Sequence, residues 1–227
     1  MDYQELLTTL ADHIASRASR EPAHPLRVAF DGIDASGKTT LADNLVQPLE
    51  ARGIPVIRAS IDGFHRPRVE RYRQGAESPM GYYEDSFDYA ALRDALLGPL
   101  GPGGSLHYRR AVFDYHVDEP ALVPEEEAPP EAVLLFDGVF LQRPELDGFW
   151  DYLIFVAVDE VVAVRRAMQR DLALFGTAEA VLARYLRRYM PAQRFYIQTV
   201  HPRDRADVIV ENNNPAQPRL VFNTQRS

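Results

Sequence analysis

The stretch GIDASGKT, from Gly32 to Thr39, has the spacing of a phosphate-binding loop. Its glycines let the backbone wrap so that successive N–H groups point inward at a phosphate. Lys38 can reach the outer phosphates of a nucleotide, and the Thr39 hydroxyl can bind Mg²⁺. The other interpretation is a glycine-rich turn with a surface lysine. The candidate nucleotide-binding residues of this segment are Gly32, Asp34, Ala35, Ser36, Gly37, Lys38, Thr39 and Thr40.

Two carboxylates follow apolar runs further along the chain. Asp62 lies at the end of the run in SIDGFH, and Asp137 ends the run in LLFDGVF. Ligands of open α/β sheets bind at the carboxyl ends of the strands, so we expect both carboxylates beside Lys38. A phosphotransferase needs one group that accepts a proton from the attacking hydroxyl and one that holds the water shell of Mg²⁺. For each aspartate alone, a turn or cap residue is the alternative.

The elements that must position these residues alternate between strands and helices. Apolar runs predict strands over 26–30, 54–61, 133–141, 151–159 and 206–214. Helical periodicity predicts helices within 1–24 and over 38–53, 87–100, 160–176 and 177–204. Segment 66–86 is predicted to be a loop, and 105–132 a hairpin or extended excursion. The strand–loop–helix–strand order from 26 to 61 is the beginning of a doubly wound α/β fold.

Composition narrows the class of protein. The chain has 227 residues and a formal net charge of −8, which gives no support to nucleic-acid binding. It has no cysteine, which excludes disulfides and thiolate metal sites and suits a reducing cytoplasm. The N-terminus lacks the basic segment and apolar core of a signal peptide, and no apolar run reaches the ~18 residues of a membrane span. We therefore expect a cytoplasmic protein without a membrane partner.

In these motifs the sequence resembles the uridine kinase-like P-loop kinases, the group that includes phosphoribulokinase and pantothenate kinase. The segments SIDGFH, GYYEDSFDYAAL, FDGVF and RRAMQRD follow the phosphate loop in the order found in that family. The resemblance runs from about residue 26 to about residue 215. It implies an α/β P-loop NTPase fold, with a parallel sheet, helices on both faces and a small lid. It also implies one kinase domain over 1–227, with the lid at about 165–200.

The resemblance assigns roles to individual residues. Asp62 matches the catalytic base, and Asp137, with Thr39, matches the Mg²⁺-binding position. Arg166 and Arg170 match lid arginines that contact the phosphates and act with Lys38 in catalysis. In the acceptor half, the matching and neighbouring positions are Asp62, Phe64, His65, Tyr83, Glu84, Asp85, Phe113 and Tyr115, with Glu84 or Asp85 gripping the ribose hydroxyls. Asn213 and Pro215 fall where the family has its adenine loop.

The acceptor half also departs from the family pattern. In FDYHVD, Asp118 takes the place of the histidine that reads a pyrimidine, and the basic pair that normally continues the lid is absent after Asp171. DGFH is also similar to pantothenate kinase-like and sugar kinase-like relatives. We therefore expect an ATP- and Mg²⁺-dependent kinase of a small hydroxyl acceptor, such as uridine or cytidine. A pantothenate-like or sugar-like acceptor is the alternative.

Two other classes of function compete with a kinase. A GTPase-type switch would need a guanine-specificity motif of the N-K-x-D kind, which the sequence lacks. A binding module without turnover would not need a base such as Asp62. Arg184, Arg187 and Arg188 are interpreted as a solvated helix surface, and Tyr185 and Tyr189 as core or pocket wall. Relatives often form oligomers, so a homo-oligomer is possible.

Overall fold

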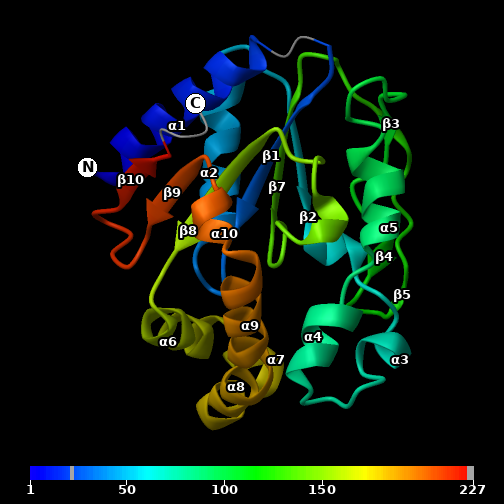
Figure 1. The fold of residues 1–227 in the computed structure, drawn as a ribbon, viewed down its shortest axis with the longest axis vertical. Helices are drawn as coiled ribbons and strands as arrows, with labels where there is room; N and C mark the ends of the chain where they lie inside the picture. The colour runs from blue at the N-terminus through cyan, green and yellow to red at the C-terminus, as the bar shows by residue number, and fades with distance from the viewer. Residues whose placement is uncertain (21–22, 224–227) are drawn as a thin grey trace.

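A six-stranded sheet forms the centre of the computed structural model, which describes residues 1–20 and 23–223 (Figure 1). Its order is β10–β9–β8–β1–β7–β2. All neighbouring strands pair in parallel except β10, which runs antiparallel to β9. The strands are β1 (Leu26–Asp31), β2 (Val56–Ser60), β7 (Val133–Gly138), β8 (Tyr152–Ala157), β9 (Val208–Glu211) and β10 (Arg219–Phe222). The predicted parallel α/β sheet is confirmed, and β10 is an addition that the sequence pattern did not indicate.

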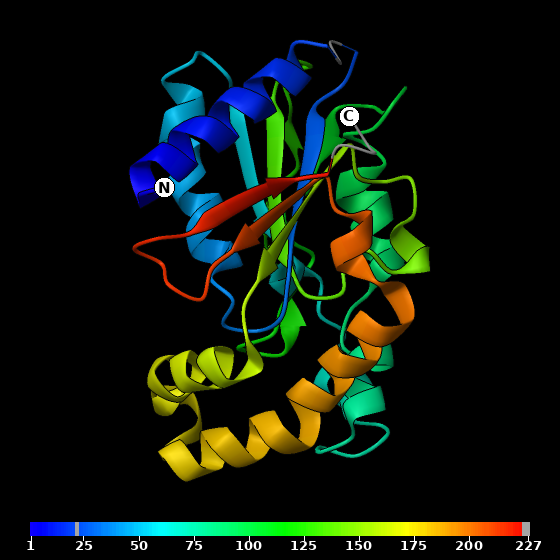
Figure 2. The same ribbon diagram turned by 60° about the vertical axis from the view of Figure 1, so that its left-hand side comes forward.

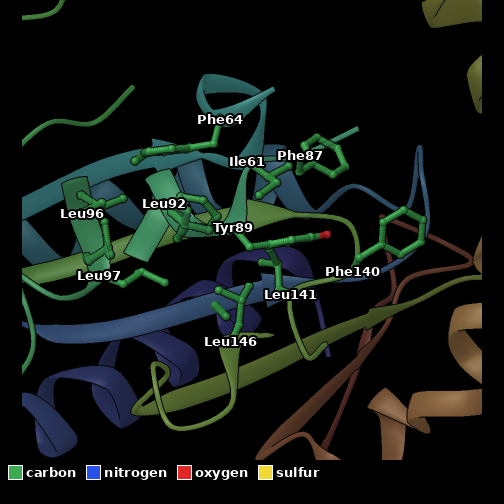
Figure 3. Packing of buried hydrophobic residues seen from close by; sticks show 14 of the residues in the cluster. Ile61, Phe64, Phe87, Tyr89, Leu92, Leu96, Leu97, Phe140, Leu141 and Leu146 are labelled. Atoms are coloured by element: carbon green, nitrogen blue, oxygen red, sulfur yellow. The ribbon is translucent and has the colours of Figure 1, made fainter. Parts of the chain in front are cut away.

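Helices cover both faces of this sheet (Figures 1 and 2). Alternate side chains of β1 divide between two cores, because successive residues of a strand point to opposite faces. Val28 and Phe30 pack with α1 (Tyr3–Ala18) and α2 (Lys38–Glu50), whereas Ala29 belongs to the opposite core. Figure 3 shows part of that second core, which includes residues from α5 (Tyr89–Leu92) and the loop after β7. The sheet is therefore packed on both faces, which fixes the positions of the carboxyl ends of its strands.

The N-terminal helix is shorter than the predicted 1–24. It begins with a reciprocal cap in which Asp2 accepts from the Glu5 backbone N–H at 2.9 Å and Glu5 accepts from the Asp2 backbone N–H at 2.9 Å. It ends at Ala18, and residues 21–22 lie outside the described part of the chain. None of the helices in residues 1–20 and 23–223 is long and apolar enough to cross a bilayer.

The predicted loop at 66–86 is wrong in part, because it contains α3 (Arg68–Arg71) and α4 (Pro79–Asp85). Ser78 caps α4 by accepting the Gly81 backbone N–H at 3.0 Å, and proline suits the first helical position since its missing N–H is not needed there. The excursion at 105–132 does form the expected hairpin-like pairs. They join β3 (His107–Tyr108) to β6 (Glu126–Glu127), and β4 (Phe113–Asp114) to β5 (Glu119–Pro120).

The lid region is helical and extends past the carboxyl ends of the strands (Figure 2). Its parts are α6 (Glu160–Arg170), α7 (Leu172–Phe175), α8 (Ala178–Arg184), a π-helical turn (Tyr185–Tyr189) and α9 (Met190–Val200), followed by α10 (Pro202–Arg205). The interpretation of Arg188 as solvated is wrong, because its side chain is buried. Its guanidinium donates to backbone carbonyls of residues 71–78 and so joins the lid to the segment before α4.

A buried carboxylate, Asp31, joins the end of β1 to three other segments. It accepts the Gly32 backbone N–H at 2.8 Å and the Gln142 side-chain amide at 3.0 Å. It also accepts the Tyr196 hydroxyl of α9 at 2.5 Å and, more weakly, the Leu141 backbone N–H at 3.4 Å. Burial raises the pKa of Asp31, and these hydrogen bonds oppose that shift. The start of the phosphate loop is thereby fixed relative to both β7 and the lid.

Removing the Tyr196 hydroxyl is expected to destabilise the protein strongly. Tyr196→Phe takes a donor from buried Asp31 and an acceptor from the Gln142 backbone N–H, which lies 3.0 Å from the hydroxyl. The lost charge-assisted hydrogen bond of Asp31 and the unsatisfied Gln142 N–H together lower the free energy of unfolding by about 2 to 4 kcal/mol. Urea denaturation measures the change. Tyr3→Phe is the matched control, because the Tyr3 hydroxyl meets Asn44 at an exposed site. Equal losses in the two variants would contradict the assignment.

Candidate active site

A cleft of about 620 Å³ opens at the carboxyl ends of β1, β7 and β2. The phosphate loop, the turn after β2, helix α4, the end of β7 and the lid all contribute to its walls. The structure brings most of the predicted donor-side residues together there. Those that line it are Asp34, Ala35, Gly37, Lys38, Thr39, Thr40, Asp62, Asp137, Arg166 and Arg170.

The phosphate loop joins β1 to α2. At two of its positions, Gly32 and Gly37, the backbone conformation and the close neighbours favour glycine. Gly37 has φ +96°, and a Cβ there would lie 2.6 Å from Asn212 Nδ2. A Cβ on Gly32 would lie 2.6 Å from the Val156 carbonyl oxygen. Lys38 is the first residue of α2, so the loop leads directly to the positive end of that helix. Its ammonium group donates to the Ile33 carbonyl at 3.1 Å. This geometry suits an anionic phosphate chain.

Thr39 and Asp137 meet beside the loop. The Thr39 hydroxyl donates to Asp137 Oδ2 at 2.5 Å, and Arg58 donates to Asp137 Oδ1 at 2.6 Å. Asp137 is the penultimate residue of β7, at the strand end where it was predicted. Groups of three or more metal-ligating side chains do not occur in the described residues.

Asp62 does not end β2 itself but lies in the 3₁₀ turn Ile61–Phe64 that follows it. Solvent reaches 58% of its side chain, so its position in the wall of the cleft removes only part of its hydration. This partial loss of hydration raises its pKa to about 6, together with repulsion from the carboxylates of Asp137 and Asp34. Lys38 opposes the shift only in part. A carboxyl group with a pKa this close to neutrality is suited to proton transfer.

His65 forms part of the wall next to Asp62. Its ring packs against Phe87 at 4.6 Å and Tyr115 at 4.7 Å between centroids, and its Nδ1 lies 3.0 Å from the Asp62 carbonyl oxygen. Burial lowers the pKa of His65 to about 4, so the ring is neutral near pH 7. His65, Phe87 and Tyr115 all line the cleft, and they give this side a largely aromatic surface.

The two predicted lid arginines lie in the cleft with different partners. Arg166 donates to the carbonyl of Asn212 at 2.6 Å and to that of Ser36 at 3.4 Å, so it links the lid to the phosphate loop. Arg170 donates to Asp171 at 2.7 and 3.0 Å and to the Tyr185 hydroxyl at 3.0 Å. Tyr185 lines the cleft too, as does Tyr189.

A second, smaller pocket of about 330 Å³ adjoins the phosphate loop on its other side. Pro215 contributes to it, as do Gly37, Thr40 and Arg166. Asn213 is not among its walls, because its side chain instead accepts the Asp159 backbone N–H at 2.8 Å. The neighbouring Asn212 lines the pocket and donates to the Ser36 carbonyl at 2.7 Å.

Several predicted acceptor residues do not line the cleft. Phe64 is fully buried in the core beside the sheet, as Figure 3 shows. Tyr83 packs under the Arg143 guanidinium, and Glu84 accepts from Gln74 at 2.9 Å. The other residues of this kind are Asp85, which is buried against Arg73 and Gln74, and Phe113, which is buried in β4. These side chains have partners away from the cleft.

Tyr82 is the residue of α4 that faces the cleft, and sequence reasoning missed it. Its hydroxyl donates to Asp34 Oδ2 at 3.0 Å. The Ser78–Pro79 start of α4 could have revealed the helix and so directed attention to its faces. Gln193 of α9, which also contacts Asp34, carried no sequence signal, because it is separated from Asp34 by 159 residues.

The parallel sheet, the phosphate loop between β1 and α2, and the cleft at the strand ends are those of a P-loop kinase fold. The chain belongs to the Phosphoribulokinase / Uridine kinase family, whose family model matches residues 28–217. It is therefore a phosphotransferase that acts on a hydroxyl group.

The relatives agree with this assignment. The chain is 30% identical over 191 residues to uridine-cytidine kinase B of Dictyostelium discoideum, covering 82% of this chain and 74% of that protein. It is 25% identical over 193 residues to a uridine kinase of Bacillus mycoides strain KBAB4, covering 82% and 85%. A solved structure of a possible uridine kinase from Bacillus stearothermophilus has a TM-score of 0.63 and 26% identity, covering 88% of this chain and 98% of that one.

The raised pKa of Asp62 predicts a titration in the pH–rate profile. Only the ionised carboxylate can accept a proton, so kcat/KM, which reports ionisation of the free enzyme, is expected to fall as the pH falls through about 6. Steady-state rates between about pH 5 and about pH 8 test this, with Asp62→Asn as the comparison because nucleotide phosphates also titrate near pH 6. Asp62→Asn is expected to lower kcat by ~10²-fold. Its pH profile should also lack the part of the fall near pH 6 that comes from protonation of Asp62. An unchanged profile and rate would exclude Asp62 as the base.

Proposed function

We propose that the protein transfers the γ-phosphate of ATP to a hydroxyl of a nucleoside such as uridine or cytidine. The observation that carries the proposal is the position of Asp62, with its pKa of about 6, in the same cleft as Lys38 and the Thr39–Asp137 pair. The kinase relatives named for uridine and cytidine favour this acceptor class. The single kinase domain and its lid, expected from the sequence over 1–227, belong to the same proposal.

In the proposed reaction, Asp62 accepts the proton of the acceptor hydroxyl. The hydroxyl oxygen forms the new bond to the γ-phosphorus as the bond to the leaving β-phosphate oxygen breaks, so ADP carries the electron pair away. Lys38 and the lid residues Arg166 and Arg170 lie where they can neutralise charge on the phosphates. The walls of the cleft hold the two reactants in line, which lowers the entropic part of the barrier.

Thr39 and Asp137 would hold Mg²⁺. Their hydroxyl and carboxylate oxygens already meet at 2.5 Å, and both are hard oxygen ligands of the kind that Mg²⁺ prefers. Bound there, the ion would supply positive charge next to the phosphates. Arg58, which also contacts Asp137, holds that carboxylate in place from the opposite oxygen.

The smaller pocket is the proposed site of the nucleotide base. It shares Gly37, Thr40 and Arg166 with the phosphate-binding end of the molecule, so a nucleotide could extend from one pocket into the other. Pro215 and Asn212 would line the base there. Asn213 would act through the backbone, since its carbonyl accepts from Arg166 at 3.1 Å.

A sugar-like or pantothenate-like acceptor is the second candidate. The observation that favours it concerns the described segment after Tyr115, which contributes no histidine to the cleft. Among the described residues, His65 is the histidine that lines it. Asp118 pairs with Arg71 at 2.8 Å and with the Arg68 backbone N–H at 2.8 Å. It is therefore occupied in holding α3 rather than in reading a base.

An acceptor screen tests the proposed reaction. ADP release is measured with ATP and Mg²⁺ across uridine, cytidine, other nucleosides, pantothenate and simple sugars. Strong stimulation by uridine or cytidine is expected, and Lys38→Ala should reduce both nucleotide affinity and rate, because it removes the ammonium group from the phosphate site. Stimulation by sugars alone would favour the second candidate. ADP release that no acceptor changes would favour an NTPase.

The metal assignment has its own test. Thr39→Ala removes one of the two proposed Mg²⁺ ligands, whereas Thr39→Ser keeps the hydroxyl. Thr39→Ala is expected to raise the Mg²⁺ concentration for half-maximal rate by about tenfold or more, while Thr39→Ser stays close to the wild type. Titrating Mg²⁺ at fixed ATP measures both. The same Mg²⁺ requirement in Thr39→Ala and the wild type would contradict the site.

A further inference from the structure

Asp34 places a carboxylate in the phosphate loop, and its negative charge repels the phosphates that such a loop binds. Its side chain is joined to two helices outside the loop. The Tyr82 hydroxyl of α4 donates to Oδ2 at 3.0 Å, and the Gln193 amide of α9 donates to the same oxygen at 2.5 Å. The Gln193 carbonyl in turn accepts the Asp34 backbone N–H at 3.0 Å. The carboxylate is therefore held among residues of α4 and α9.

The second carboxylate oxygen has spare hydrogen-bonding capacity. Within residues 1–20 and 23–223, Oδ1 of Asp34 accepts no hydrogen bond, and Asp34 is only half-buried in the wall of the cleft. Its charge acts on Asp62, Tyr82, Tyr185 and Tyr189, and it contributes to the raised pKa of each. Asp34 thus lies in the aromatic part of the cleft, near the candidate base.

The fixed charges of this part of the cleft are acidic in balance. Asp34 and Asp62 contribute two carboxylates. The guanidinium of Arg170 pairs with Asp171, at 2.7 and 3.0 Å, and the proposed reaction assigns both Arg166 and Arg170 to the phosphates of the donor. Lys38 lies on the phosphate loop, where the donor phosphates would take up its charge. The carboxylates of Asp34 and Asp62 would repel an acceptor that carries its own carboxylate or phosphate, because no cation among the described residues of this part of the cleft is left to pair with it.

We propose that Asp34 belongs to the acceptor half of the site: its Oδ1 accepts a hydrogen bond from an acceptor hydroxyl and selects neutral polyhydroxyl acceptors over anionic ones. This inference rests on the proposed kinase reaction and specifies the residue that determines its acceptor class. A hydroxyl donor is matched to a carboxylate, and a charge-assisted hydrogen bond is stronger than a neutral one. Tyr82 and Gln193 act as positioning residues, because both donate to Oδ2 and leave Oδ1 for the acceptor.

The test pairs the protein variant with deletions of acceptor hydroxyls. Asp34→Asn keeps the shape of the side chain and removes its charge. It is expected to raise the KM for the acceptor by ~10-fold, a larger change than that in the KM for ATP. For the wild type, deoxy analogues of the preferred acceptor identify the hydroxyl whose removal costs most in kcat/KM. In Asp34→Asn, removal of that same hydroxyl should cost several-fold less, because the partner is already weakened.

Asp94→Asn is the matched control, since Asp94 is exposed and does not line the cleft. Equal penalties for every deoxy analogue in the wild type and Asp34→Asn would overturn the inference. So would a change confined to the KM for ATP, which would mark Asp34 as a support of the phosphate loop. A preference for glycerate or pantothenate over uridine, ribose and fructose would overturn it too, while leaving the kinase reaction intact.

The outcomes separate this inference from the proposed function. If the wild type phosphorylates neutral sugars but no nucleoside, the proposed acceptor is wrong and the role of Asp34 is still tested with deoxy sugars. If it phosphorylates uridine and Asp34→Asn loses no discrimination, the proposed function stands and the inference fails. If no compound stimulates ADP release, both are contradicted.

Discussion

The buried carboxylate of Asp31 is the constraint on which the arrangement of the site depends. A charge removed from water is costly unless hydrogen bonds satisfy it, and the donors to Asp31 come from separate parts of the chain. Gly32 begins the phosphate loop, Gln142 follows β7, and Tyr196 lies on α9. The hydrogen bonds that satisfy Asp31 therefore hold the phosphate loop, the segment after β7 and helix α9 close together.

The same contact determines where Gln193 lies. Gln193 and Tyr196 are three residues apart on α9, so they share a face of the helix. Once the Tyr196 hydroxyl has reached Asp31, Gln193 is held against Asp34, three residues further along the loop. A rotation of α9 would break both contacts together. Helix α9 is thus joined both to the end of β1, at Asp31, and to the phosphate loop, at Asp34.

The sequence was informative where the signal is local and weak where it depends on packing. The phosphate loop, β1 and α2 are contiguous, so spacing and periodicity were sufficient to predict them. In the segment GYYEDSFDYAAL, the sequence singled out Tyr83, Glu84 and Asp85, whereas in the structure Tyr82 faces the cleft and Tyr83 packs against Arg143. Which of two adjacent residues faces a ligand depends on the orientation of a helix in the fold. The contact of Gln193 with Asp34, far apart in sequence, was beyond such reasoning.

The carboxylates of Asp34, Asp62 and Asp137 lie in one cleft, and this arrangement affects both the stability of the fold and the basicity of Asp62. Loss of hydration and, after it, the charges of Asp137 and Asp34 disfavour ionisation of Asp62 and raise its pKa. The folded protein binds a proton at Asp62 more tightly than the unfolded chain does, so this group lowers stability as the pH rises from about 4 to about 6. The same effects make Asp62 a stronger base near neutral pH. Asp34 would then affect the reaction twice, by contacting the acceptor and by adjusting the base that activates it.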